Sequence, residues 1–123
     1  MQQWDDKSPI YRQLSEQISS QIRDGIWQEG SALPSVRGVA ADLKINHLTV
    51  MKSYQLLVDE ALVEKRRGQG MFVCIGAIAA LKAKERQHFI DVDIPALAKK
   101  LTRMEISVEE MNQQLNALLR EQK

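Results

Sequence analysis

Residues 33–73 read LPSVRGVAADLKINHLTVMKSYQLLVDEALVEKRRGQGMFV, and this stretch decides the fold because it contains three segments with different patterns. In the first, Pro34 keeps the preceding backbone extended and Ser35 is a natural N-cap. The pattern predicts a short helix from about Ser35 to Leu43. Its apolar face consists of Val36, Val39, Ala40 and Leu43.

The second segment is a longer helix that follows almost at once. Residues 44–46 leave room only for a tight turn, and Asn46 can cap the next helix. Two short helices joined so closely cross steeply, as in a helix-turn-helix. The apolar positions of the second helix are Val50, Tyr54, Leu57, Val58 and Ala61, which places the Tyr54 ring in the core with its hydroxyl toward the backbone.

The third segment changes from helical to strand periodicity. Val63 to Arg66 and Met71 to Cys74 form short strand-like runs. Between them lie residues 67–70, whose two glycines permit the positive φ angles of a turn. A hairpin directly after a helix-turn-helix is a wing, and such a unit binds DNA by placing its second helix in the major groove.

This sequence resembles the winged helix-turn-helix domain of the GntR family of bacterial transcription regulators. The turn at residues 44–46 and the short helical tail look like those of the YtrA subfamily. The resemblance implies a sequence-specific regulator, a repressor of its own or a neighbouring transporter-type operon. The matching residues are Pro9-Ile10-Tyr11, Ile26, Gly30, Leu33-Pro34-Ser35, Arg37, Thr49-Val50, Tyr54, Leu57 and Arg66 to Val73.

Candidate DNA contacts lie at the start of each helix of the pair and in the hairpin turn. His47 occupies the first turn of the second helix, the part that normally meets base edges. Thr49 and Lys52 can reach phosphate oxygens, although either could also lie on a solvated face. The full set predicted to bind DNA is Ser35, Arg37, Asn46, His47, Thr49, Lys52, Arg66, Arg67, Gly68 and Gln69.

Two cationic positions in this set have specific alternatives. Arg37 has a counterpart that commonly touches DNA in the resembling family, while its alternative is a surface ion pair with Asp42. Residues 65–67 form the strongest charge cluster of the chain, and such clusters are usually only solvated. Here the cluster lies at a hairpin tip, so we expect arginine in the minor groove, with Gly68 allowing close approach.

The segment before this stretch predicts one more helix. Pro9 fits a first turn, and apolar residues recur at every fourth position from Ile10 to Ile22. Gly25 ends this helix, and residues 26–27 are expected to fold back onto it as a hydrophobic contact.

After Cys74 the pattern is entirely helical. Ser107 and Glu110 form a capping box before the last helix. The apolar stripes cannot all be buried in so thin a layer, so they predict a two-fold dimer, which in turn binds an inverted repeat. The residues predicted to dimerise are Ile78, Leu81, Phe89, Ile94, Leu97, Leu101, Met111, Leu115 and Leu118.

The predicted fold class is therefore mostly α with a small β wing. Residues 1–75 form the winged helix-turn-helix DNA-binding domain, and residues 76–123 form a helical dimerisation region. We also expect a hinge near residues 74–77. An effector ligand, if one exists, would act by binding one arrangement of the DNA-binding units better than another.

Composition excludes several other classes of protein. The 17 Lys and Arg residues nearly balance the 16 Asp and Glu residues, so the overall charge does not indicate nucleic-acid binding. Only local clusters of basic residues do. Cys74 is the only cysteine, which excludes an intrachain disulfide and a thiolate metal cluster. We expect a cytoplasmic protein with no catalytic residue, metal or cofactor. The alternatives to a specific regulator are a protein-interaction module and a non-specific architectural DNA binder.

Overall fold

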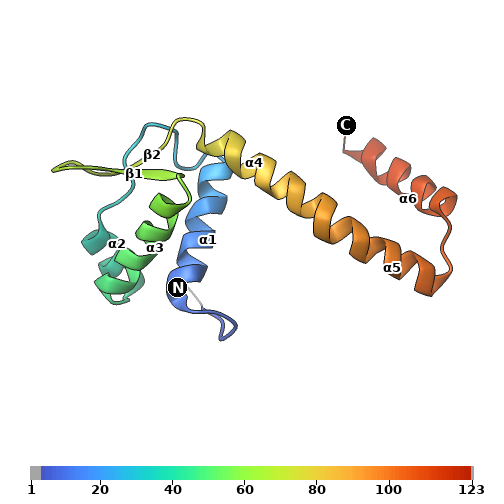
Figure 1. Ribbon diagram of the computed structural model, residues 1–123, viewed down its shortest axis with the longest axis horizontal. Coiled ribbons are helices and arrows are strands. Elements are labelled where there is room, and N and C mark those ends of the chain that lie inside the picture. The colour runs from blue at the N-terminus through green and yellow to red at the C-terminus, as the bar shows by residue number, and fades with distance from the viewer. Residues whose placement is uncertain (1–3, 123) are drawn as a thin grey trace. The chain divides into compact units, whose positions relative to one another are not determined.

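The computed structural model describes residues 4–122. It is mostly helical with one small antiparallel sheet, which confirms the predicted fold class (Figure 1). Two compact units are distinguished: the first ends at Lys84 and the second begins at Glu85. The elements are α1 (Ile10–Arg23), α2 (Val36–Leu43), α3 (His47–Asp59), β1 (Val63–Arg66), β2 (Gly70–Val73), α4 (Ala77–His88), η1 (Phe89–Asp93), α5 (Ile94–Met104) and α6 (Val108–Glu121).

Helix α1 supplies one wall of the core of the first unit. Its residues Leu14, Ile18 and Ile22 are buried, as the four-residue spacing predicts. Gly25, at φ 82°, ends the helix, and the Ile26 N–H donates to the Gln21 carbonyl at 2.8 Å. The expected contact after this cap is made by Trp27, which packs against the core, while Ile26 remains 63% exposed.

Helices α2 and α3 form the predicted helix-turn-helix, and α3 packs against both α1 and α2 (Figure 1). Both N-caps are formed by side chains: Ser35 Oγ accepts from the Gly38 N–H at 3.0 Å, and Asn46 Oδ1 accepts from the Leu48 N–H at 2.9 Å. Lys44 takes the left-handed conformation at φ 56° and ends α2. Each boundary of the pair is therefore encoded by residues next to it.

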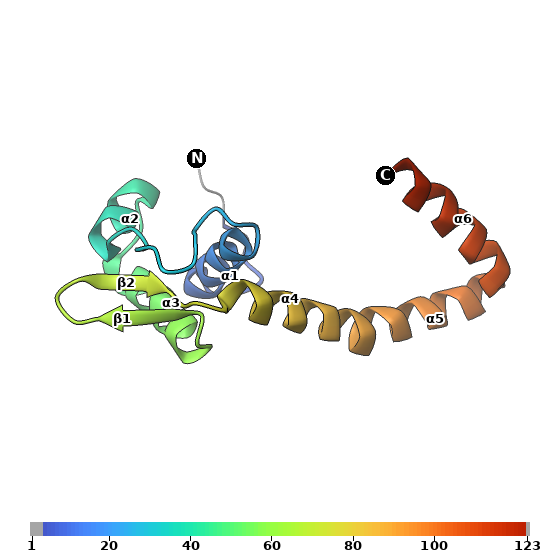
Figure 2. The same ribbon diagram turned by 90° about the horizontal axis from the view of Figure 1, so that it is seen from above.

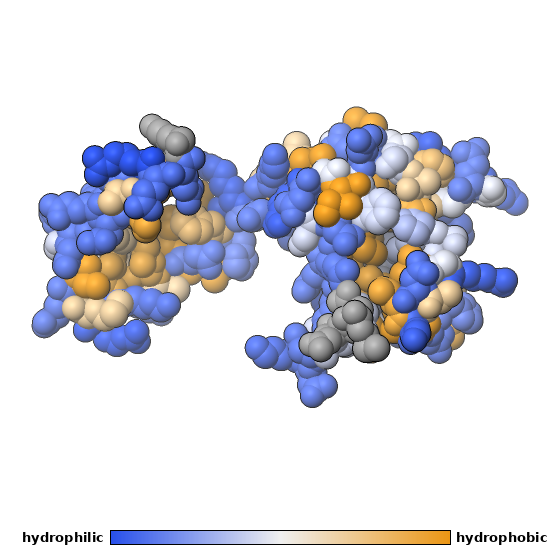
Figure 3. Space-filling model, turned by 180° about the vertical axis from the view of Figure 1, so that it is seen from behind, coloured by the Kyte–Doolittle hydropathy of each residue, from blue (hydrophilic) through white to orange (hydrophobic). Residues whose placement is uncertain are grey.

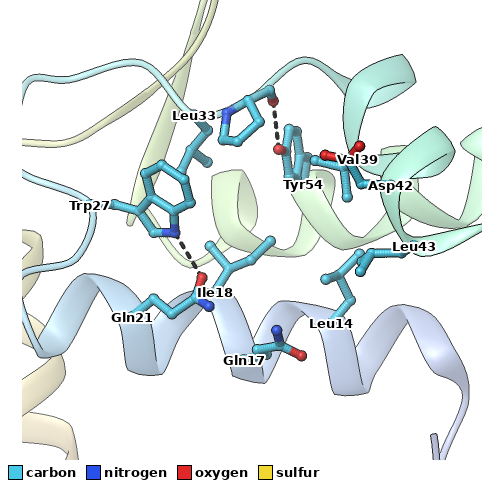
Figure 4. Close-up of a pocket in the computed structure, with 11 residues that line it drawn as sticks. Leu14, Gln17, Ile18, Gln21, Trp27, Leu33, Val39, Asp42, Leu43 and Tyr54 are labelled. Carbon is cyan, nitrogen blue, oxygen red and sulfur yellow. Dashed lines mark hydrogen bonds between the residues drawn. The ribbon is translucent and has the colours of Figure 1, made fainter. Parts of the chain in front are cut away.

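Tyr54 joins α3 to the entrance of α2. Its side chain is only 1% exposed, and its hydroxyl donates to the Pro34 carbonyl at 2.6 Å (Figure 4). Burial raises the pKa of Tyr54 to about 12. The predicted core position and backbone contact of this tyrosine are both confirmed.

Strands β1 and β2 form the predicted wing, and their hairpin projects beyond the helices of its own unit (Figure 2). Arg66 pairs with Gly70, so β2 begins one residue earlier than the sequence suggests. Cys74 was predicted to end the second strand, which is wrong, because β2 ends at Val73. The outer edge of β2 is not left open, since Leu33 N–H donates to the Met71 carbonyl at 2.8 Å.

The start of α4 is fixed to the first unit by a distant side chain. Ala77 is buried, and the Ile78 N–H donates to Glu29 Oε2 at 2.9 Å. Hydrogen bonds from the backbone N–H groups of Gly76 and Ile78 lower the pKa of Glu29 below its ordinary value. The expected hinge at residues 74–77 is thus replaced by an anchored helix start, while the boundary between the units lies after Lys84.

Substituting Glu29 with Gln is expected to destabilise the first unit at neutral pH. The pKa of this carboxyl is lower in the folded chain than in the unfolded chain. Its ionised form therefore contributes stability above the unfolded pKa of about 4.3, and this contribution is lost as pH falls through the folded pKa. Urea unfolding of wild type and Glu29→Gln should differ most near pH 7 and converge in acid.

The exposed Glu16 of α1 provides the matched control for this experiment, because Glu16→Gln removes the same charge away from any helix start. Its unfolding free energy should stay within about 0.5 kcal/mol of wild type. A difference between wild type and Glu29→Gln that does not change with pH would show that packing, rather than the charge, is lost.

Residues 77–104 are helical without interruption, in agreement with the entirely helical pattern after Cys74. The transition is the π-helical turn η1, in which the Ile94 N–H donates to the Phe89 carbonyl. Pro95 explains this turn, because its ring has no N–H and would crowd the carbonyl four residues earlier in a regular α-helix. Within residues 85–122, which the structure describes, no side chain is buried.

Candidate nucleic-acid interface

The N-terminal ends of α2 and α3 open onto one shared hollow. Arg37, Asn46 and His47 line this surface depression of about 670 Å³, together with Ala40, Ala41 and Ile45. Arg37 and His47 are both exposed. Among the described residues Arg37 forms no ion pair, so the alternative partner Asp42 does not neutralise it. Three of the predicted contacts are therefore adjacent and have side chains available to an external ligand.

Two of the predicted contacts already have structural roles. Ser35 Oγ and Asn46 Oδ1 accept the hydrogen bonds that cap α2 and α3. Each side chain still has a donor to offer, the hydroxyl proton of Ser35 and the amide NH₂ of Asn46. Both groups can therefore donate to a phosphate or a base edge without breaking the cap.

Along α3, Lys52 is exposed and Thr49 is half-buried. The Lys52 ammonium lies 5.3 Å from the centre of the Tyr11 ring, within the range of a cation–π interaction. This contact restricts a flexible cation to the edge of α3 that faces α1. Tyr11 was not predicted to take part in the site, and no local pattern reveals it, because Tyr11 and Lys52 are 41 positions apart.

The two arginines of the wing differ in their contacts. Arg66 lies over the Phe72 ring, 4.0 Å from its centre, and its Nη2 lies 2.9 Å from Glu64 Oε1. Arg67 lies in the turn, exposed and without an ion pair among the described residues. Gly68 follows at φ +75°, and a Cβ placed there would meet nothing within 4 Å. The predicted cationic tip is therefore Arg67 above all, since Glu64 partly neutralises Arg66.

Replacing Arg67 with Ala is expected to weaken DNA binding by about tenfold across all sequences. The slope of log affinity against log salt should become shallower by about 0.9 for each wing engaged, because one cation that neutralises the charge of the DNA is lost. A filter-binding titration over several salt concentrations measures both quantities. Lys100→Ala, which removes an exposed cation from α5, serves as the control. If both variants show the wild-type slope, the Arg67 side chain does not engage the DNA.

A separate pocket of about 230 Å³ lies between α1, α2 and residues 27–34 (Figure 4). Two polar groups in its wall are already engaged: Trp27 Nε1 donates to Gln21 Oε1 at 2.7 Å, and the Tyr54 hydroxyl donates to Pro34. Its volume is below the roughly 300–1,000 Å³ usual for small-molecule sites. We therefore treat it as part of the packing around α2.

Within residues 4–122, no helix is both long enough and apolar enough to cross a membrane. The same described part of the chain contains no group of three or more His, Cys, Asp or Glu side chains placed to hold a metal ion.

The chain matches the model of a known protein family. The family described as "Bacterial regulatory proteins, gntR family" matches residues 10–73, which run from the start of α1 to the end of β2. The match thus contains both helices of the helix-turn-helix and the wing.

Several curated proteins are similar to the chain. YhcF of Bacillus subtilis, an uncharacterized HTH-type transcriptional regulator, is 31% identical over 111 residues, covering 89% of this chain and 88% of YhcF. The HTH-type transcriptional repressor YtrA of Bacillus subtilis is 37% identical over 74 residues, covering 60% of this chain and 57% of YtrA. The chain spans only 16% of the length of YdcR from Escherichia coli, to which it is 41% identical over 73 residues.

The chain is also similar in fold to solved structures of related proteins. The crystal structure of a GntR-family transcriptional regulator from Bacteroides thetaiotaomicron has a TM-score of 0.78 and 28% identity, covering 94% of this chain and all of that one. The DNA-binding domain of AraR, solved in complex with its operator ORX1, has a TM-score of 0.54 and 26% identity. The AraR comparison covers 59% of this chain and 93% of the AraR domain.

Proposed function

Because the chain belongs to the gntR family of bacterial regulatory proteins, whose members bind DNA to regulate transcription, we propose that it is a sequence-specific repressor. It binds its operator as a homodimer. The observation that carries the proposal is the shared hollow at the N-terminal ends of α2 and α3. There the exposed Arg37 and His47 lie beside the capped start of α3, with no acidic partner for Arg37 among the described residues.

In this proposal α3 enters the major groove and the wing meets the minor groove. His47 faces base edges, while Ser35, Arg37, Asn46, Thr49 and Lys52 hold the phosphate backbone. Arg67 enters the minor groove, with Gly68 and Gln69 close to it and Arg66 at the base of the turn. The AraR domain, which is bound to an operator in its crystal structure, supports DNA as the ligand of this surface.

Residues 1–75 are proposed to bind DNA and the helical region after them to dimerise. Of the residues predicted to dimerise, Ile78 and Leu81 instead pack against the core of the first unit, so the dimer contact is proposed for the residues after Lys84. Figure 3 shows hydrophobic side chains gathered over the C-terminal helices, at the left of that view. Fully burying one such side chain contributes about 1.5–3 kcal/mol, so a second copy of this surface is a sufficient partner. The large hydrophobic residues exposed there are Phe89, Ile90, Val92, Ile94, Leu97, Met104, Val108, Leu115, Leu118 and Leu119.

A two-fold dimer presents two copies of α3, so the operator should be an inverted repeat. Its half-sites should be separated by about one turn of DNA or a multiple of it. We propose that this repeat lies upstream of the protein's own gene or of a neighbouring transporter-type operon. The similar Bacillus subtilis repressor YtrA supports repression rather than activation.

The test is a mobility shift with the intergenic DNA upstream of the gene, at physiological salt and with excess random competitor. A discrete complex that resists the competitor, and a footprint over an inverted repeat, are expected. Diffuse binding that disappears as competitor rises would instead favour an architectural protein. No binding at all would favour a protein-interaction module.

A further inference from the structure

Helix α3 carries two large apolar side chains on its outward face. Leu48 is 55% exposed and Met51 is 50% exposed. Three positions apart, they are neighbours on the helix surface. The buried residues Val50, Tyr54 and Leu57 occupy the opposite face. About half of the area of Leu48 and Met51 is open to solvent, and this apolar area is available to an external partner.

The surroundings of this pair indicate the chemistry of that partner. His47 and Lys52 adjoin it along α3, and Arg37 shares a hollow with His47. A surface bordered in this way by cationic and hydrogen-bonding groups is complementary to a polyanion. In the major groove of DNA the apolar group on a base edge is the C5-methyl of thymine. A leucine and a methionine there can exclude water from such a methyl group but cannot hydrogen-bond to a base.

We propose that Leu48 and Met51 read thymine methyl groups, so that each half-site contains A·T pairs where these side chains lie. The inference rests on the proposed function, because it assigns bases to the face of α3 that enters the groove. His47 then hydrogen-bonds to base edges at the start of the helix. Leu48, directly after His47, and Met51, about one helical turn beyond His47, determine specificity by shape and hydrophobic contact.

The experiment is a set of operators in which each thymine in turn is replaced by uracil, which removes one methyl group and keeps base pairing. Wild-type protein should lose about fourfold in affinity at the thymines in contact, the effect of burying one methyl group. At one of these positions, Leu48→Ala should bind the operator equally well with thymine or with uracil. Met51→Ala should show the same insensitivity at a different position. This is a double-mutant cycle between one side chain and one methyl group.

Ile75→Ala is the matched control, because Ile75 is 79% exposed but lies outside α3. It should keep the full wild-type response to uracil. Unfolding midpoints of all three variants should match wild type, since none of these side chains is buried. If wild type forms a discrete complex but no uracil substitution changes its affinity, the inference is wrong while the proposed function stands. The same conclusion follows if the loss of affinity with uracil persists in both Leu48→Ala and Met51→Ala. If wild type forms no competitor-resistant complex, the proposed function and the inference both fail.

Discussion

Replacing both Leu115 and Leu118 with Asp is expected to convert the protein to a monomer and to reduce operator affinity by at least about 100-fold. Both leucines lie on α6 and are exposed, at 43% and 55%. In the proposed dimer their side chains are buried, where an unpaired carboxylate is strongly unfavourable. A monomer engages one half-site at a time and loses the high effective concentration that the linked second unit provides.

The control for this prediction introduces the same charge on the other side of the same helix. Gln113→Asp with Ala117→Asp adds two carboxylates at exposed positions and should leave the dimer intact. Light scattering at micromolar concentration measures the mass, and a mobility-shift titration measures the affinity. The dimer proposal fails if wild type is already monomeric, or if the leucine variant keeps the dimer mass.

Substituting Tyr54 with Ala is expected to lower the free energy of unfolding of the first unit by about 3–5 kcal/mol. The ring is 1% exposed and belongs to the core that joins α1 and α3. Small domains are stable by only about 5–15 kcal/mol, so a large fraction of the variant should be unfolded at 37 °C. Loss of DNA binding follows, because Tyr54 also holds Pro34 at the entrance of α2.

Tyr54→Phe separates the ring from the hydroxyl. It keeps the packing but leaves the Pro34 carbonyl without its donor, which should cost about 1–2 kcal/mol. Urea unfolding followed by circular dichroism gives both values. Equal losses in the Phe and Ala variants would mean that the hydrogen bond, rather than the ring, stabilises the helix pair.

The sequence predicts the helix-turn-helix and wing well because their signals are local. Ser35 and Asn46 cap the helices that directly follow them, and Gly68 lies in the turn that it permits. The contact between Glu29 and the start of α4 could not be predicted, because it joins residues 49 positions apart. Pro95 lies in the first turn of α5, where a missing N–H is tolerated, but the π-helical turn that joins α5 to α4 has no signal in the sequence beyond this proline.

The candidate site is predictable to a similar degree. Residue type and position indicated Arg37, His47 and Arg67, all of which the structure leaves exposed. That Glu64 engages Arg66 was overlooked, although the two lie two positions apart on β1 and therefore on the same face of the strand. Leu48 and Met51 were also overlooked. Their phase, opposite to that of Val50 and Tyr54, is the signal that could have identified them.

The π-helical turn η1 also bears on how such a chain can diverge. A turn of this kind accommodates one residue more than an α-helical turn, so deleting one codon between Phe89 and Asp93 would restore the regular repeat. Because the wider turn already absorbs the additional residue, the side chains of α5 would keep their directions about the helix axis relative to residues 85–88. A one-residue deletion within residues 85–88, where no wide turn absorbs it, would instead rotate every following side chain by about 100° and change the proposed pairing surface, while all codons of the DNA-binding domain remain unchanged.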